Sequence, residues 1–303
     1  MLNMTEFIDM ISDKIPNLEL KKDVPMSRLT SFRIGGPVDC AAFPKTEEAL
    51  SALLKLCKEN EITPVILGAG TNVLAPDAGL RDLAIVLKDA LEGMEQVSET
   101  CIRVLAGVTM SRAAVFAAGL NLGGLEFAHG IPGTVGGGVY MNAGAYGGEI
   151  KDVCTRVRIM DMAGNARWIS REEAAFSYRH SAIEDNPWIV VAVEFELTPR
   201  PEAEVWAKMK ELIGKRRASQ PLDLPSAGSA FKRPVGGYAA ALIEQTGLKG
   251  FRVGGAAVSE KHAGFVVNLG GATAADVQEL LKAVSDKVYD RTGIRLEPEV
   301  RIW

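Results

Sequence analysis

The sequence predicts an α+β protein with more than one domain, on the basis of three observations. With 303 residues, the chain is longer than a single hydrophobic core usually requires. Amphipathic helical segments and short apolar, strand-like runs are mixed along it. The 19 residues from Gly130 to Gly148 include eight glycines, a density that we do not expect inside a helix or strand. This segment therefore indicates a loop whose main-chain N–H groups approach an oxyanion, as in a large phosphate-bearing cofactor.

The first two thirds of the chain predict helices and strands in mixed order. Residues 1–20 have the pattern of an amphipathic helix followed by a turn. Thr46 should begin the next helix, over 46–61, because acidic residues occupy its first turn. The other predicted elements are strands over 40–43, 64–68, 83–87, 101–107 and 188–199, a helix over 111–119, and a hairpin over 154–170 that turns at Ala163–Gly164–Asn165.

The composition changes at Thr198, where a proline-containing stretch precedes a predicted helix over 203–217, and we place the main domain boundary there. Thr273 should cap the last helix, with Asp276 three residues on and Gly293 at its end. The remaining predictions after Thr198 are a glycine-rich loop near Ser229, a helix over 239–245, and strands over 251–258, 264–270 and 294–303.

Composition excludes several functional classes. The formal net charge is −4 and the charges are well mixed, so no basic stripe predicts nucleic-acid binding. The first residues lack an apolar signal core, and no apolar run approaches the length of a membrane span, so we expect a cytoplasmic protein without membrane contact. The four cysteines form no CxxC pair, which argues against a zinc site, and we expect no metal.

Two glycine clusters carry the cofactor prediction. LGAGTNVL (67–74) follows a strand, but Val73 stands where a Rossmann fingerprint needs its third glycine, and no amphipathic helix follows. Taken alone, this cluster is a tight turn. GIPGTVGG and MNAGAYGG add Thr134, Asn142 and Tyr146, whose polar groups can bond phosphate, ribose or a ring carbonyl. Two such clusters in one mixed region favour a bound cofactor.

Seven motifs that occur in order resemble one family. They are TSFRIGGPVD, GAGTNVL, GIPGTVGGGVYMNAGAYGGEI, FSYRHS, PSAGSAFKRP, GLKGFRVGGAAVSEKHAGFVVN and LEPEVRIW. Together they closely resemble the UDP-N-acetylenolpyruvoylglucosamine reductases, flavoenzymes of bacterial cell-wall synthesis, from about Leu29 to Trp303. Because no insertion follows Arg179, the chain is similar to the shorter of the family's two types, which lacks a segment that covers the substrate.

The resemblance implies a vanillyl-alcohol-oxidase-type FAD-binding domain over 1–198, made of two α+β subdomains (about 1–90 and 91–198), and a smaller α+β substrate-binding domain over 199–303. It also implies non-covalent FAD, with NADPH as hydride donor. His129 would be a packing or polar neighbour of the flavin. The implied cofactor contacts are Gly68, Ala69, Gly70, Thr71, Asn72, Val73, Leu74, Pro132, Gly133, Thr134, Gly136, Gly137, Asn142, Gly144, Ala145 and Tyr146.

The chemistry implied is hydride transfer from NADPH to FAD, then to the vinyl carbon of an enolpyruvyl ether, and protonation of the neighbouring carbon. Arg179 would hold the carboxylate with its planar fork. Ser229 would donate the proton, with Lys232 or Arg233 supplying positive potential. A protonated Glu299 would bond the enol oxygen. Without the resemblance, an exposed ion pair, a turn residue and a solvated carboxylate are the default interpretations of the three.

Glu297 lies two residues before Glu299 on the same predicted strand face, so periodicity alone leaves both open, and only the resemblance selects Glu299. The substrate contacts that it implies are Tyr178, Arg179, Gln220, Lys232 and His262, with Arg217 and Asn268 as further candidates. Arg301, on the terminal strand, is a candidate contact of the flavin.

Two other functions compete with the reductase. An FAD-linked oxidase of the same superfold, acting on an alcohol or hydroxy acid, should lack the GSxF and PEV motifs, and this chain has both. A non-catalytic nucleotide-sugar or flavin-binding protein need not keep Arg179, Ser229 and Glu299. We therefore expect a monomeric reductase whose partner is a small nucleotide-sugar substrate.

Overall fold

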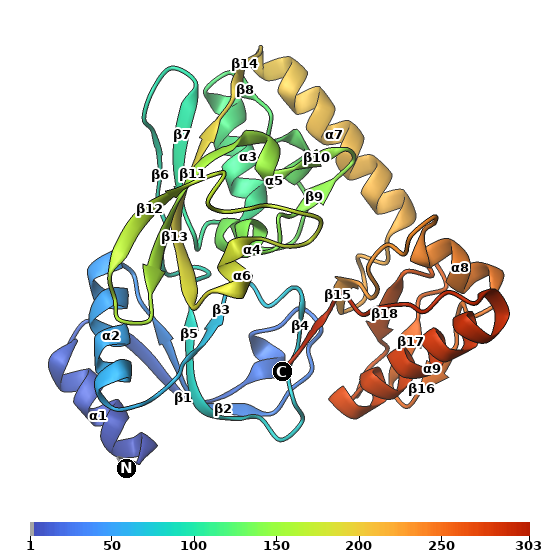
Figure 1. Cartoon of the computed structure of the whole chain (residues 1–303), viewed down its shortest axis with the longest axis horizontal. Helices are drawn as coiled ribbons and strands as arrows, with labels where there is room; N and C mark the ends of the chain where they lie inside the picture. The colour runs from blue at the N-terminus through green and yellow to red at the C-terminus, as the bar shows by residue number, and fades with distance from the viewer. Residues whose placement is uncertain (1–2) are drawn as a thin grey trace. The chain divides into compact units, whose positions relative to one another are not determined.

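The structure is a computed structural model that describes residues 3–303 and divides into two compact units (Figure 1). Unit 1 contains the residues up to Lys22, Asp39–Ala69 and Asp82–Gly214. Unit 2 contains Asp23–Val38, Gly70–Arg81 and Lys215–Trp303. Both units are assembled from separated segments, whereas the predicted division at Thr198 gives two continuous ones. That division stays a prediction about sequence segments.

Unit 1 is built on an antiparallel sheet of order β12-β11-β13-β7-β6 (Figure 1). The predicted hairpin is present, and its turn is held by Asp161, whose Oδ1 accepts hydrogen bonds of 2.9 Å from the amides of Ala163 and Asn165. The strands are β6 (Met94–Gln96), β7 (Cys101–Leu105), β11 (Cys154–Asp161), β12 (Ala166–Ser170) and β13 (Trp188–Glu196).

A buried carboxylate joins three strands of this sheet. Glu194 on β13 is 5% exposed and accepts hydrogen bonds of 2.6–3.0 Å from Arg103 and Arg156. Burial alone would raise the pKa of Glu194, but the bonds from the two guanidinium groups outweigh it and lower this pKa. Arg156 also lies over the Trp168 ring at 4.5 Å. The network ties the sheet together at one point.

The predicted helices of unit 1 form where local signals place them. Thr46 caps α2 (Glu47–Glu59), because its hydroxyl accepts the amide of Ala49 at 3.1 Å. Apolar residues at helical spacing on α2 are fully buried. Further elements before the glycine-rich segment include α1 (Met4–Lys14), α3 (Met110–Gly119) and a sheet of order β1-β2-β5-β3, formed by β1 (Glu19–Pro25), β2 (Pro37–Phe43), β3 (Val65–Leu67) and β5 (Leu80–Val86).

The glycine-rich segment corrects one prediction, because it contains a helix, α4 (Val135–Tyr140), that packs on β13 and β7. Close packing explains its glycines. A Cβ at Gly136 would lie 2.8 Å from the Cβ of Ala106, and one at Gly138 would lie 2.8 Å from Sδ of Met110. The packing of this short helix against its neighbours overrides the low helix propensity of glycine.

Unit 2 contains a sheet of order β15-β18-β17-β16 and two helices, α8 (Ala239–Gln245) and α9 (Ala274–Thr292). The end signals of α9 are confirmed: Thr273 and Asp276 form a capping box, and Gly293 has φ 72°. The buried stripe of α9 completes the core. The strands are β15 (Ser226–Ser229), β16 (Arg252–Val253), β17 (Ala256–Val258) and β18 (Phe265–Asn268).

Three predictions in the last hundred residues need correction. The segment near Ser229 is a strand rather than a loop, and the run 251–258 is a hairpin because Gly254 turns the chain at φ 50°. The terminal strand is confined to β19 (Arg301–Ile302), which pairs in parallel with β4 (Val73–Leu74). Pro298 lacks the N–H that a regular ladder needs. This β19–β4 pair links two segments of unit 2 that are distant in sequence.

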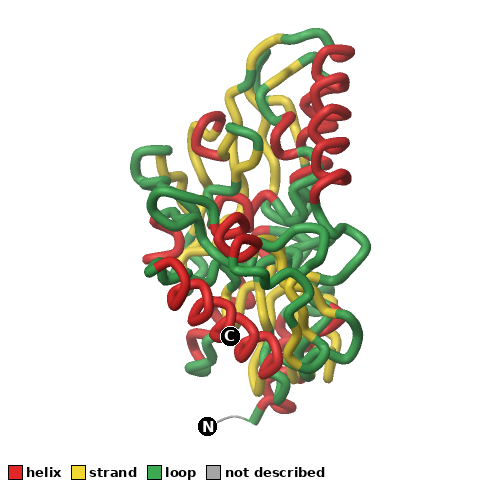
Figure 2. The backbone as a smooth tube through the Cα atoms, turned by 90° about the vertical axis from the view of Figure 1, so that its right-hand side faces the viewer, coloured by secondary structure: helices red, strands yellow, loops and turns green. Residues whose placement is uncertain are grey.

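Helix and strand are interspersed along the backbone of both units (Figure 2). Within residues 3–303, no helix is long and apolar enough to cross a membrane. The elements not yet named are η1 (Met26–Arg28), β8 (Leu122–Gly123), η2 (Glu126–Ala128), β9 (Gly144–Ala145), β10 (Gly148–Glu149), α5 (Ile150–Val153), α6 (Ala182–Asp185), β14 (Thr198–Pro199) and α7 (Glu202–Ser219).

Candidate functional site

The two glycine clusters meet in unit 1. A Cβ at Gly68 would lie 2.5 Å from Oγ1 of Thr134, so only a glycine allows the first cluster to approach the second this closely. Thr134 is 1% exposed, and its hydroxyl caps α4 by accepting the amide of Gly137 at 3.3 Å. The predicted contacts Gly68 and Thr134, 66 positions apart in the sequence, thus lie side by side.

The first amides of α4 do not point to an open anion site, contrary to what the glycine density predicts. Val135 N–H donates to the carbonyl oxygen of Val108 at 2.8 Å, and Gly136 N–H donates to that of Ala106 at 3.0 Å. Gly137 N–H has Thr134 as its acceptor. Because these donors are satisfied inside the protein, Gly136 serves close packing against Ala106, and Gly137 leaves the exposed side of the helix without a side chain.

The segment NAGAYGG folds into the hairpin β9–β10, with Tyr146 (φ 54°) and Gly147 (φ 88°) at its turn. Asn142 fixes this hairpin through side-chain hydrogen bonds. Its fully buried amide donates to Oε2 of Glu149 at 3.0 Å and to Ser177 O at 2.9 Å, and accepts from the Lys151 amide at 3.0 Å. Asn142 therefore positions the hairpin, which leaves Tyr146 exposed at its tip.

Arg179 lies beside the same hairpin. Its Nη2 donates to Gly144 O at 3.3 Å, and its guanidinium lies 5.2 Å from the ring centre of Tyr178. At φ 54°, Arg179 occupies the left-handed region that non-glycine residues avoid, a strain that clusters at functional sites. A hydrogen bond from Lys151 lowers the pKa of Glu149, and the charge of Arg179 contributes. Arg179 thus contacts two other residues that the resemblance assigns to the site, Tyr178 and Gly144.

His129 directly precedes the glycine-rich segment, and its surroundings show whether the residues present fit a cofactor. Its Nδ1 is buried and has no hydrogen-bond partner among residues 3–303. Its ring lies edge-on to Trp206 on α7, with centroids 6.2 Å apart, and burial lowers the pKa of His129. An unpaired buried polar atom next in sequence to the glycine-rich segment fits a ligand with polar ring atoms. The residues present therefore fit the flavin.

The second half of the GAGTN turn lies in unit 2, against the C-terminal strand. Gly70 has φ 59°, and a Cβ there would lie 2.3 Å from Leu29 O. Asn72 accepts the Arg301 amide at 2.9 Å through its carbonyl oxygen and donates from Nδ2 to Glu299 O at 3.2 Å. The predicted contacts from Gly70 to Leu74 are thus fixed to the segment that carries Glu299.

Ser229 lies in unit 2, beside the same segment. It ends β15 after a bulge, since Ser226 pairs with Val267 but Ser229 pairs with Phe265. Bulges re-aim side chains next to active sites, and here Ser229 is exposed. The next residue, Ala230, accepts the Glu299 amide at 2.9 Å through its carbonyl oxygen. The structure therefore brings the backbones at Ser229 and Glu299 close together, and their roles as site residues stay predictions.

The two carboxylates that periodicity left open have different surroundings. Glu297 has a side chain that is 69% exposed, and it forms an ion pair with Lys232. Glu299 is half-buried. This difference in exposure favours Glu299 as the carboxyl group that contacts a ligand.

The guanidinium of Arg233 is stacked on the exposed ring of Tyr238, 4.3 Å from the ring centre.

The remaining predicted contacts in unit 2 have structural partners. Nδ1 of His262 accepts the Gly264 amide at 3.1 Å, which places the proton of a neutral ring on Nε2, and burial lowers the pKa of His262. Asn268 is buried and donates to Phe32 O at 3.1 Å. Oε1 of Gln220 accepts from Arg216 at 3.0 Å. Their contacts with a substrate stay predictions.

Comparison with known proteins places these segments in a family. The family model described as "FAD binding domain" matches residues 38–170, and "UDP-N-acetylenolpyruvoylglucosamine reductase, C-terminal domain" matches residues 220–303. The chain is 44% identical to the UDP-N-acetylenolpyruvoylglucosamine reductase of Agathobacter rectalis, covering 99% of each. It is 45% identical to that of Clostridioides difficile, over 94% of this chain and 93% of the relative.

A solved structure agrees. The crystal structure of UDP-N-acetylenolpyruvylglucosamine reductase from Thermus caldophilus has a TM-score of 0.77 and 34% identity, and covers 95% of this chain and 99% of its own. The fold is therefore the predicted α+β fold, with an FAD-binding domain. The chain belongs to the UDP-N-acetylenolpyruvoylglucosamine reductase family.

Proposed function

We propose that the chain is an NADPH-dependent FAD enzyme that reduces the enolpyruvyl ether of UDP-N-acetylglucosamine enolpyruvate to UDP-N-acetylmuramate. One observation carries the assignment of roles. In unit 2, the turn predicted to hold the cofactor bonds to the Glu299 segment through Asn72, and Ser31 bonds both to this turn and to β15. Ala230, the residue after β15, accepts the amide of Glu299. This arrangement is what a cofactor-dependent reduction with protein-assisted protonation requires.

The atoms balance as follows. FAD, when bound, would supply the chemistry that carries a hydride from NADPH to the terminal vinyl carbon. Ser229 donates a proton to the neighbouring carbon, so the double bond becomes a single bond and NADP⁺ is released. Since Ser229 is exposed, its hydroxyl can regain the proton from water. The net consumption is one NADPH and one proton for each molecule reduced.

Arg179 and Glu299 act on the charge that develops during the reduction. Arg179 binds the substrate carboxylate with two parallel N–H groups. Glu299, as a neutral acid, donates a hydrogen bond to the enol oxygen. Lys232, Tyr178, Gln220 and His262 would contact the rest of the nucleotide sugar. We propose further that the enzyme acts as a monomer in the cytoplasm.

An anaerobic experiment with purified, FAD-loaded protein tests this function. NADPH should bleach the flavin absorbance, and enolpyruvyl-UDP-N-acetylglucosamine should restore it. Recolouring by oxygen alone, without any response to the sugar nucleotide, would assign the chain to the oxidases of the same superfold. Protein that takes up no FAD would be a binding protein instead.

A further inference from the structure

Ser31 connects two segments of the candidate site in unit 2. Its Oγ donates a hydrogen bond of 2.6 Å to Ser226 O, and its amide donates one of 3.0 Å to Gly70 O. A second approach of Oγ to Gly70 O is 3.4 Å, so the shorter contact takes the single hydroxyl proton. Ser31 thus bonds to β15 with its side chain and to the GAGTN turn with its backbone.

Both bonded segments lead directly to proposed site residues. Ser226 begins β15, and Ser229 ends it. Gly70 begins the half of the GAGTN turn from which Asn72 bonds to Glu299 O. The hydroxyl of Ser31 is therefore a short connection between the strand of the proton donor and the turn predicted to hold the cofactor.

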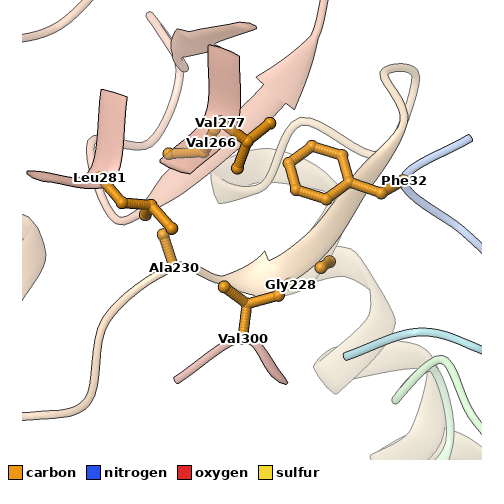
Figure 3. Close-up of a pocket in the computed structure, with 8 residues that line it drawn as sticks. Phe32, Gly228, Ala230, Val266, Val277, Leu281 and Val300 are labelled. Atoms are coloured by element: carbon orange, nitrogen blue, oxygen red, sulfur yellow. The ribbon is translucent and has the colours of Figure 1, made fainter. Parts of the chain in front are cut away.

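The packing behind β15 makes this connection important. A cavity of about 10 Å³ lies there, surrounded by apolar side chains (Figure 3). Such a void forfeits dispersion contacts, and its apolar lining offers water no partners. The bulge before Ser229 also interrupts the ladder to β18. The lining residues are Phe32, Ala227, Gly228, Ala230, Val266, Val277, Leu281 and Val300.

We propose that Ser31 is a positioning residue, which fixes the strand of Ser229 relative to the cofactor turn through its hydroxyl bond to Ser226 O. The inference rests on the proposed function and deepens it. The cavity and the bulge leave β15 with fewer packing and ladder contacts than a regular strand has, so this bond contributes to holding the strand in place. Loss of the hydroxyl should therefore slow protonation of the substrate and leave the rate of flavin reduction by NADPH unchanged.

The test measures both half-reactions in stopped flow with FAD-loaded variants. Ser31→Ala should reduce the flavin with NADPH within about twofold of wild type. Its reoxidation at saturating sugar nucleotide should slow about tenfold, because a misplaced donor costs rate rather than affinity. Ser31→Thr, which keeps the hydroxyl, should restore most of the rate. Ser31→Cys, a weak donor of similar size, should lie between Ser and Ala.

Thr30→Val is the matched control. The Thr30 hydroxyl donates to Ile34 O at 3.3 Å, a bond inside its own loop, so its loss should leave the ratio of the two half-reactions unchanged. If Ser31→Ala does not fold, the Cys and Thr variants still give the ordered series.

Two results would overturn the proposal for Ser31. In one, reoxidation of the Ala and Cys variants matches wild type. In the other, both half-reactions slow equally or FAD is lost, which makes Ser31 a residue of the fold or of cofactor binding. If the sugar nucleotide does not reoxidise the reduced flavin of the wild-type protein, the proposed function is overturned instead. The wild-type measurement therefore distinguishes failure of the proposed function from failure of the proposal for Ser31.

Discussion

The side-chain amide of Asn72 donates a hydrogen bond of 3.2 Å to the main-chain oxygen of Glu299, across 227 positions of sequence. The backbone of Asn72 reinforces it by accepting the amide of Arg301 at 2.9 Å. A residue of the predicted cofactor turn thus holds the segment that carries the proposed acid. The position of Glu299 relative to the turn is built into the fold of unit 2.

If Glu299 acts as a neutral hydrogen-bond donor, an amide should replace it better than a methyl group does. Glu299→Gln keeps a donor of similar length, and we expect sugar-dependent flavin reoxidation to fall about tenfold. Glu299→Ala removes the donor, and the fall should reach 10²–10³-fold, roughly the cost of one oxyanion-hole group. Stopped-flow reoxidation measures both. Equal rates for the Gln and Ala variants would contradict this role.

Arg179 should not tolerate lysine, because a single ammonium cannot form two parallel bonds to a carboxylate. For Arg179→Lys we expect kcat/KM for the sugar nucleotide to fall about 100-fold, with flavin reduction by NADPH unchanged. Arg167→Lys is a matched control, since Arg167 is half-exposed in an ion pair with Glu173. Steady-state kinetics at fixed NADPH give both values. An unaffected Arg179→Lys enzyme would remove Arg179 from the substrate site.

Glu194 should make stability depend on pH. Its folded-state pKa lies below the ordinary value of 4.5. The contribution of Glu194 to the free energy of unfolding is therefore complete above pH 4.5 and is lost as the pH falls through the lower, folded-state pKa. Glu194→Gln should cost about 2 kcal/mol at pH 7, the range for hydrogen bonds to charged groups. Thermal melts between pH 3 and 7 should show wild type and variant converging in acid. Parallel curves would be the contrary result.

Gly136 should resist alanine although it lies in a helix. Its Cβ would press against Ala106, so Gly136→Ala should destabilise the protein by about 2 kcal/mol through overpacking. Gly214 in α7 is the control, because nothing lies within 4 Å of a Cβ there. Gly214→Ala should stabilise by up to about 1 kcal/mol through helix propensity. Denaturant unfolding measures both, and effects of the same sign would contradict the packing argument.

Features with local causes were predictable from the sequence. The ends of α9 follow from Thr273, Asp276 and Gly293, because each of these residues bonds to a partner about one helical turn away in the sequence. The hairpin of β11 and β12 follows from the turn after Asp161. In each case the residues that decide the structure are neighbours in the chain.

Features that depend on distant partners were not predictable. The helix α4 contradicts its own glycine content, and only contact with Ala106 and Met110 explains it. Ser31 belongs to the motif TSFRIGGPVD, but the acceptor of its hydroxyl, Ser226 O, is 195 residues away in the sequence. Nothing local in Glu194 reveals that two arginines on other strands will surround it. Long-range pairing of this kind is set by tertiary packing, which periodicity and spacing do not encode.

The central claim is that Ser229 protonates the substrate carbon after hydride delivery, and Ser229→Ala tests it most directly. General-acid loss should slow sugar-dependent reoxidation of the flavin by about 10²–10⁴-fold. Reduction by NADPH, in the same stopped-flow experiment, should stay within about twofold of wild type. Reoxidation at the wild-type rate, or equal loss of both half-reactions, would contradict the account.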